Sequence, residues 1–259
     1  MKTTTNPLYA RLIARAALAL LLDFPAGAAT FTVTPSADAF VTPGPSGNLS
    51  GTNYGGAGAL SVAAPDLAKG EFQSVMQFNL SSAVASFNAQ LGAGQWNIQS
   101  ITLSLTATAP NNGIFNASAA GQFGISWMQN DSWTEGSGTP TSPGATGITF
   151  SSLPSFLSAN DESLGTFSFA GGTTGMATYT LNLTPDFLAD ASAGDSVSFR
   201  LFAADSGVSY LFNSRSIGTP SARPQLTIVA VPEPPVGAVF GAGATLVFVA
   251  WRRRREGSE

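Results

Sequence analysis

ITLSLTA, residues Ile101–Ala107, places apolar and hydroxyl side chains at alternate positions. Ile101, Leu103 and Leu105 fall on one face of an extended chain, and the intervening threonines and serine fall on the other. This period of two is typical of an antiparallel strand that packs one face against a core and turns the other toward solvent. The stretch therefore predicts sheet rather than helix.

The same alternation recurs along the chain between residues 30 and 230. Clear candidates are Phe123–Trp127, Tyr179–Leu183, Val197–Leu201 and Gln225–Val229, and shorter ones are Phe31–Thr34, Ala37–Val41, Leu60–Ala63 and Val75–Leu80. Glycine, proline and asparagine clusters between them predict turns. Only Thr184–Ala191 is predicted to be helical, with Thr184 as N-cap and proline in the first turn. We predict an all-β fold, an antiparallel β-sandwich of the jelly-roll kind with one short helix. A division into two smaller domains is disfavoured because no linker-like segment interrupts the pattern.

Composition excludes several classes of chemistry. The 259 residues include no cysteine and no histidine, which excludes thiol nucleophiles, imidazole bases, disulfides and zinc sites built on those residues. Between residues 30 and 231, four basic residues face eleven acidic ones, a net charge of −7. Such a body has no basic patch for nucleic acid or anionic lipid, and we predict neither as a partner.

The N-terminal segment has the order of a secretory signal peptide. Basic residues precede the short apolar run Ala16–Leu22, and small residues follow at Ala26–Ala28. This order predicts export with cleavage near residue 29, and we assign residues 1–29 to the signal peptide. A disordered tail ahead of the domain is the alternative.

The C-terminal segment combines an apolar run with a basic end. Val236–Trp251 contains 16 uncharged residues, which as a helix would span roughly 24 Å, short of the hydrocarbon core of about 30 Å. Four arginines follow and would hold this end in the cytoplasm, leaving the body outside. A helix of a soluble core is the alternative, but the terminal arginines make it a poor one. We predict a single short transmembrane helix.

This segment resembles the PEP-CTERM sorting signal. The resemblance covers residues 231–259, where a Pro-Glu-Pro motif, a glycine-rich apolar run and an arginine cluster occur in that order. It implies a Gram-negative bacterium that makes exopolysaccharide and a membrane-embedded exosortase as processing partner. By this resemblance the recognised motif is Pro232, Glu233 and Pro234, and the cytoplasmic stop is Arg252, Arg253, Arg254 and Arg255. Prolines also hold the motif extended, a shape suited to an enzyme groove.

The body between the two terminal segments resembles DNRLRE-type modules, which are jelly-roll domains of bacterial surface proteins related in plan to carbohydrate-binding modules. The similar segments occur in the family's order between residues 37 and 229: ADAFV, NYGGAGALSV, SVMQFNLS, IQSITLSLT, DSWTEGSGTPTS and LFNSRSIGTPSARPQLTIV. The resemblance implies a non-catalytic surface domain at residues 30–230.

Asp131–Gly136 is the segment richest in side chains that could take part in catalysis or metal binding. Its carboxylates, Asp131 and Glu135, stand near two tryptophans and could be interpreted as a glycosidase pair. Sequence neighbours seldom face each other across a cleft, so we predict no catalytic residue. The same two carboxylates could instead help to hold a structural Ca²⁺, which takes oxygen ligands from loops; otherwise no cofactor is expected.

Three aromatic residues are candidates for contacts with a glycan: Trp133, Tyr54 and Tyr210. Exposed aromatic rings in loops can stack on sugars, although the alternative for Trp133 is a hydrophobic plug beneath a loop. Together these observations predict an exported, exosortase-processed protein of the cell surface or extracellular matrix. Its expected role is structural or adhesive, in association with exopolysaccharide or biofilm. The alternatives are a carbohydrate-binding module with a specific glycan site and, less favoured, a polysaccharide hydrolase.

Overall fold

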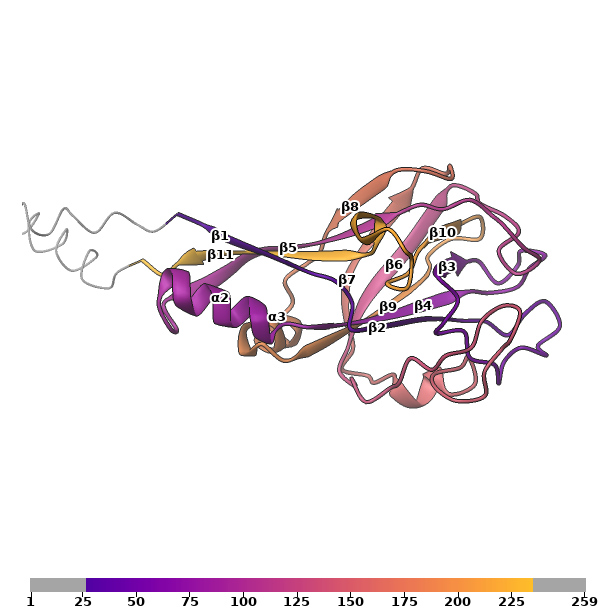
Figure 1. Ribbon diagram of the computed structural model, residues 1–259, viewed down its shortest axis with the longest axis horizontal. Helices are drawn as coiled ribbons and strands as arrows, with labels where there is room; N and C mark the ends of the chain where they lie inside the picture. Colours follow the sequence, from indigo (N-terminus) through magenta and orange to yellow (C-terminus); the bar gives the residue numbers. More distant parts are fainter. Residues whose placement is uncertain (1–26, 235–259) are drawn as a thin grey trace, which may run out of the picture.

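The computed structural model describes residues 27–234 (Figure 1). Within this range, eleven strands form antiparallel sheets, accompanied by two short α-helices and two 3₁₀ turns. The prediction of an all-β antiparallel sandwich is therefore confirmed. Most of the predicted signal peptide, the predicted transmembrane helix and the four terminal arginines lie outside the described residues.

Two sheets and one strand pair make up the architecture, and all their neighbouring strands are antiparallel. The first sheet has the order β1 (Ala29–Val33), β11 (Gln225–Pro232), β5 (Trp96–Thr106) and β8 (Met176–Thr180). The second sheet has the order β2 (Ala37–Val41), β4 (Gln73–Asn79), β9 (Ser196–Ala203), β6 (Gly121–Met128) and β7 (Glu162–Phe169). The remaining pair joins β3 (Ala59–Ala63) to β10 (Ser209–Asn213).

The main core lies where the apolar faces of these strands meet. Ile101, Leu103 and Leu105 of β5 are fully buried there, as their alternation predicts. Leu103 is paired with Leu226 of β11 and with Tyr179 of β8, so one apolar row runs across three strands. Burial of such side chains contributes roughly 1.5–3 kcal/mol each and is the main force that holds the sheets together.

The prediction of one helix is wrong, because the described residues contain two. The expected helix is α3 (Pro185–Ala193), and the second is α2 (Ser81–Leu91). Figure 1 shows α2 beside α3, and α2 packs against β1, β11 and β5. Phe87 of α2 is fully buried, with its ring 5.2 Å from that of Trp96. The 3₁₀ turns are η1 (Leu153–Phe156) and η2 (Pro220–Ala222).

Helix α3 is capped by a side chain from another strand. Thr184 stands at the N-cap, but its hydroxyl donates to Glu162 Oε2 at 2.6 Å instead of accepting from the helix. Glu162, the first residue of β7, also accepts the backbone N–H groups of Phe187 at 2.8 Å and Asp186 at 3.3 Å. These hydrogen bonds lower the pKa of Glu162, although partial burial opposes them.

Replacing Glu162 by alanine is expected to lower the free energy of unfolding by about 1 kcal/mol, the usual cost of a lost helix cap. Denaturant unfolding at neutral pH measures the effect. Ser163→Ala is the matched control, because this neighbouring exposed side chain makes no contact with α3 among the described hydrogen bonds. Equal unfolding midpoints for Glu162→Ala and the wild type would show that the cap contributes nothing.

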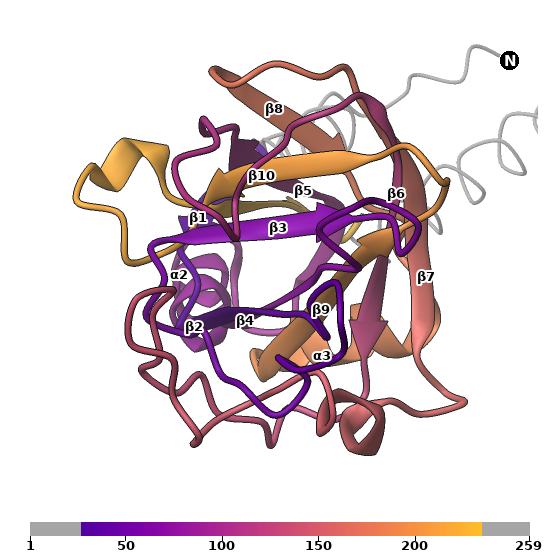
Figure 2. The ribbon, with the colours of Figure 1, turned by 90° about the vertical axis from the view of Figure 1, so that its right-hand side faces the viewer.

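A long connection covers the outer face of the second sheet. Residues 129–161 join β6 to β7 and run below the second sheet in Figure 2, together with η1. Trp133, Ile148 and Leu153 from this connection form a second, smaller core cluster with Val41 and Val75 of the sheet. The second sheet is thus buried on both faces at β2, β4 and the end of β6, whereas β7 keeps exposed residues.

The two described ends of the chain lie at the same end of the first sheet. Ala29 pairs with Ala230, so β1 begins beside the place where β11 ends (Figure 1). The strands extend beyond the predicted body of 30–230 at both ends, because Ala29 and Pro232 are strand residues. Across residues 27–234, no helix has the length and apolar character needed to cross a bilayer.

Candidate functional site

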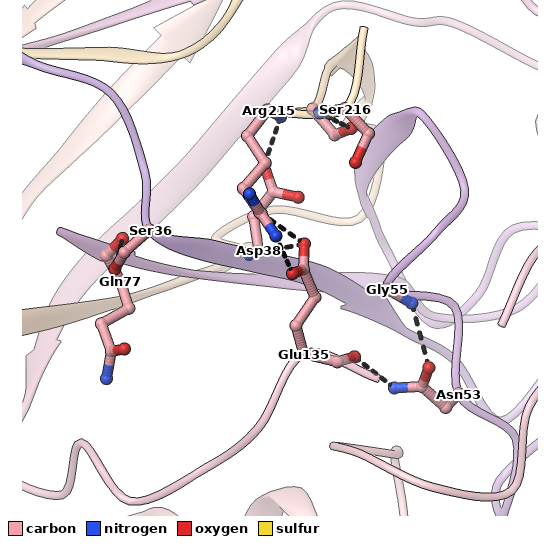
Figure 3. Close-up of polar contacts among 9 residues, drawn as sticks. Ser36, Asp38, Asn53, Gly55, Gln77, Glu135, Arg215 and Ser216 are labelled. Atoms are coloured by element: carbon pink, nitrogen blue, oxygen red, sulfur yellow. Dashed lines mark hydrogen bonds and ion pairs between the residues drawn. The ribbon is translucent and has the colours of Figure 1, made fainter. Parts of the chain in front are cut away.

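Four segments that are distant in sequence meet in one polar cluster (Figure 3). Asp38 comes from β2, Asn53 from the β2–β3 connection, Glu135 from the connection 129–161, and Arg215 from the segment after β10. We call these four residues the polar cluster. The polar cluster lies at the edge strand β2. There it joins the connection 129–161 to the second sheet and to the β3–β10 pair.

Glu135 and Arg215 form the ion pair of the cluster, and it is the one salt bridge within residues 27–234. Arg215 Nε donates to Glu135 Oε1 at 2.8 Å, and Nη2 donates to Oε2. A guanidinium favours this bidentate geometry. The hydrogen bonds to Glu135 raise the pKa of Arg215. Glu135 Oε1 also accepts the backbone N–H of Asp38 at 3.3 Å, which occupies a donor on the free edge of β2.

Asp38 is the fully buried acid of the cluster. Its Oδ2 accepts the backbone N–H of Arg215 at 2.6 Å, while Oδ1 has no hydrogen-bond partner. Burial raises the pKa of Asp38 to about 7; the charge of Glu135 adds to the effect, and the Arg215 N–H and charge oppose it. A protonated carboxyl therefore suits this position, because a buried charge without full pairing is costly.

Asn53 fastens the connection 129–161 to the rest of the fold. Its Nδ2 donates to the carbonyls of Glu135 at 2.7 Å and Ile148 at 2.8 Å. Its Oδ1 accepts the N–H groups of Gly55 at 3.1 Å and Gly138 at 3.2 Å. One buried side chain thus uses its amide to satisfy four backbone groups from two segments.

Close backbone contacts explain the glycines of this region. A Cβ atom on Gly138 would lie 1.9 Å from the carbonyl oxygen of Asn53, and one on Gly55 would lie 2.1 Å from that of Glu135. Both distances are far shorter than any real contact between such atoms. The glycines of NYGG and EGSG are therefore required so that the two segments can approach each other.

The aromatic residues predicted to contact a glycan are buried, and the prediction is corrected accordingly. The exposed fractions are 1% for Tyr54, 0% for Tyr210 and 4% for Trp133, so a sugar ring cannot reach their faces. Tyr54 stacks on Phe40 with ring centroids 4.5 Å apart, and Trp133 donates through Nε1 to Ser198 Oγ at 2.9 Å. The hydrophobic plug proposed as the alternative for Trp133 is confirmed.

Tyr210 is the second residue of β10, so it belongs to a strand and not to a loop. Its ring stacks on that of Phe169 at a centroid distance of 3.9 Å, and its hydroxyl accepts that of Tyr179 at 3.4 Å. These rings line a hollow of about 210 Å³ beside the β7–β8 connection, with Met176 at the side. The stacked partner occupies the face of Tyr210 that a sugar would need.

Asp131 and Glu135 have different surroundings, which counts against both roles considered for the pair. Both carboxylate oxygens of Glu135 bind Arg215, whereas Asp131 lies near Asp190, Asp195 and Ser198. Burial raises the pKa of Asp131 to about 6, and the two neighbouring acids add to this effect. Within the range 27–234, no three acidic side chains gather in a way that could hold a metal ion.

The first part of the predicted sorting motif belongs to the sheet. Pro232 is the last residue of β11 and pairs with Trp96, and the N–H of Glu233 donates to the carbonyl of Gln95 at 2.8 Å. Glu233 and Pro234 are exposed. The motif therefore begins in ordered sheet and continues in chain that a partner can reach.

Sequence reasoning missed Asp38, Asn53 and Arg215 as site residues. They occur within the segments ADAFV, NYGG and NSRS, which carry the resemblance to surface modules, but no periodicity brings them together. A usable signal was the low charge of the chain: Asp38 is an acid inside an otherwise apolar strand, and such a residue needs a partner.

Comparisons with known proteins add no relative. No protein-family model matches this chain. No curated protein sequence matches it either.

Proposed function

We propose that this chain is an exported surface or extracellular-matrix protein whose β-sandwich has a structural or adhesive role. In this proposal an exosortase recognises Pro232, Glu233 and Pro234 after export across the inner membrane, while the C-terminal helix holds the chain transiently in the bilayer. The sandwich is proposed to be of the jelly-roll kind, and the role to be association with exopolysaccharide without catalysis.

One observation carries the proposal for the body. Four of the six segments that resemble DNRLRE-type surface modules each contribute one member of the polar cluster, although these members are separated by up to 177 residues. The contacts join the four segments within one body, as a single surface module requires. The role of such modules is taken as the proposed role here.

The arrangement of the cluster also favours a structural role over catalysis. A general base or nucleophile needs a carboxylate oxygen that substrate can reach. Both oxygens of Glu135 are held by Arg215, and Asp38 is closed off from solvent. The cluster joins segments of the fold and offers no open acid–base pair, so the hydrolase alternative receives no support.

The sorting proposal is tested by the intact mass of the mature protein from its native host. We expect the mass to lack the arginine tail, because the exposed Glu233-Pro234 segment is accessible to a processing enzyme. A triple alanine replacement of Pro232, Glu233 and Pro234 is expected to retain the tail. The control is Pro220→Ala, which removes an exposed proline from η2 and is expected to be processed normally. A wild-type mass that includes Arg252–Arg255 would refute processing.

A further inference from the structure

The outer face of the first sheet carries a row of hydroxyl groups. Thr32 of β1 pairs with Thr227 of β11, which pairs with Thr102 of β5, which pairs with Thr180 of β8. One row of threonines therefore crosses all four strands. A parallel row follows at Ser104 and Thr178, which are also paired. We call these six residues the hydroxyl face.

The threonines of the hydroxyl face are open to solvent, in contrast to the residues of the second sheet beneath the connection 129–161. Thr32, Thr178 and Thr180 are exposed, and Thr102 and Thr227 are half-buried, whereas Ser104 is buried at 9% exposure. The connection 129–161 covers the second sheet, but no described helix or long connection packs over this row. The helix α2 packs against the opposite, apolar side of β1 through Phe31 and Phe87.

No charged residue occurs in any of the four strands that build this face. Exposed strand positions usually include charges, which also protect sheet edges from unwanted pairing. A charged polymer would find no counter-charge here, and polyanions would in addition be repelled by the net charge of −7 between residues 30 and 231. The face therefore selects an uncharged partner.

The hydrogen-bonding capacity of the hydroxyl groups indicates which class of uncharged partner fits this face. Each Ser or Thr hydroxyl offers one donor and two acceptor positions, the same capacity as a sugar hydroxyl. Neighbouring hydroxyls already pair, as at Thr32 and Thr227 (2.9 Å) and at Ser104 and Thr178 (2.8 Å), and each threonine of these pairs keeps further hydrogen-bonding positions. With strands about 4.8 Å apart, the four-strand row spans roughly 14 Å. This length suits an extended polymer lying across the strands.

A second copy of this chain is a weaker candidate for the partner of the hydroxyl face. Stable dimer interfaces have apolar centres, and Met176, at 59% exposure, is the one large hydrophobic side chain exposed between residues 27 and 234. It stands at the end of β8, at the margin of the hydroxyl face. The six residues themselves offer hydrogen bonds and almost no apolar area.

We propose that the hydroxyl face binds a neutral polysaccharide chain laid across the four strands of the first sheet. The inference rests on the proposed surface function and specifies the chemical class of its partner. Binding is through hydrogen bonds from the threonine row to sugar hydroxyls and not through aromatic stacking, because Tyr54, Trp133 and Tyr210 are buried.

The test uses the full chain in mild detergent and measures its retention on insoluble polysaccharides. Cellulose, chitin and a β-1,3-glucan are the neutral probes, and alginate and chitosan are the anionic and cationic comparators. We expect retention on at least one neutral probe and none on alginate. The double replacement Thr102→Val, Thr227→Val is expected to weaken that retention about tenfold, because two hydrogen-bonding groups are lost while the β-branched shape is kept.

Thr166→Val is the matched control, since Thr166 is an exposed threonine on β7 of the second sheet; its retention is expected to equal that of the wild type. Circular dichroism establishes that each variant is folded. The proposal is overturned if no neutral probe retains the chain, if the double variant is retained as well as the wild type, or if alginate is preferred. It is also overturned if sedimentation shows a dimer that the double variant abolishes. The intact-mass experiment is independent of this one, so a processed chain that fails to bind would refute only the binding.

Discussion

Replacing Asn53 by alanine is expected to lower the free energy of unfolding by about 4 kcal/mol or more. The change leaves two buried carbonyls and two buried N–H groups without partners, those of Glu135, Ile148, Gly55 and Gly138. Each buried polar group left unsatisfied costs roughly 1–3 kcal/mol. The loss is expected to be local at first, because the same side chain fastens the connection 129–161 to the fold.

Guanidinium denaturation measures the stability, and limited proteolysis reports whether the connection 129–161 opens before the rest of the domain. Asn182→Ala is the matched control, because Asn182 is exposed and its side chain makes no hydrogen bond in the described part of the chain; a change of about 0.5 kcal/mol or less is expected. If Asn53→Ala and Asn182→Ala unfold at the same denaturant concentration, the fastening role of Asn53 is wrong.

Asp38 is expected to make the protein less stable as the pH rises from about 4 to about 7. Its pKa in the folded state is about 7, above the ordinary value of 3.8, so over this range the folded state binds a proton that the unfolded state has released. Linkage then requires the free energy of unfolding to fall with increasing pH and to level off above the folded-state pKa. Ionisation of a buried carboxyl with one free oxygen is the physical cause.

The replacement Asp38→Asn is expected to remove this decline and to stabilise the protein at pH 8 by up to about 4 kcal/mol, the equivalent of a shift of roughly three pKa units. The amide oxygen can still accept the N–H of Arg215. Unfolding curves recorded from pH 4 to pH 9 measure the effect. Asp131→Asn is the comparison, because the pKa of Asp131 is raised only to about 6 and a smaller change is expected. An unchanged pH dependence in Asp38→Asn would contradict the prediction.

The strands that sequence reasoning found include both half-exposed strands such as β5 and the fully buried strand β3, and those that it missed are β7 and β10. In β5 the alternation of Ile101, Leu103 and Leu105 with hydroxyl residues is visible without any structure. Every residue of β10 (Ser209–Asn213) is buried, so burial does not distinguish its two faces; the equally buried β3 was nevertheless found. Helix α2 was missed although Ala83, Phe87 and Leu91 are spaced four residues apart, which is a helical spacing.

The polar cluster could not be predicted from local patterns, because its members come from four separate segments. Only the order of weak motifs indicated that ADAFV, NYGG, WTEG and NSRS belong together. Trp133 illustrates the opposite error: its position in a polar segment suggested exposure, but the connection that carries it folds back over the second sheet. Whether a loop residue is covered depends on the path of the whole connection, which sequence neighbours do not reveal.

The pairing of Ala29 with Ala230 has a mechanical consequence. Strand β11 is hydrogen-bonded to β1 on one side and to β5 on the other. A pull on Pro234 directed along β11 would load these two ladders in shear, so that many bonds resist together instead of opening one after another. A tether at this end would therefore pull along the direction in which β11 resists most strongly. The sandwich could then carry tension between a cell envelope and a polymer bound to the opposite part of the sheet.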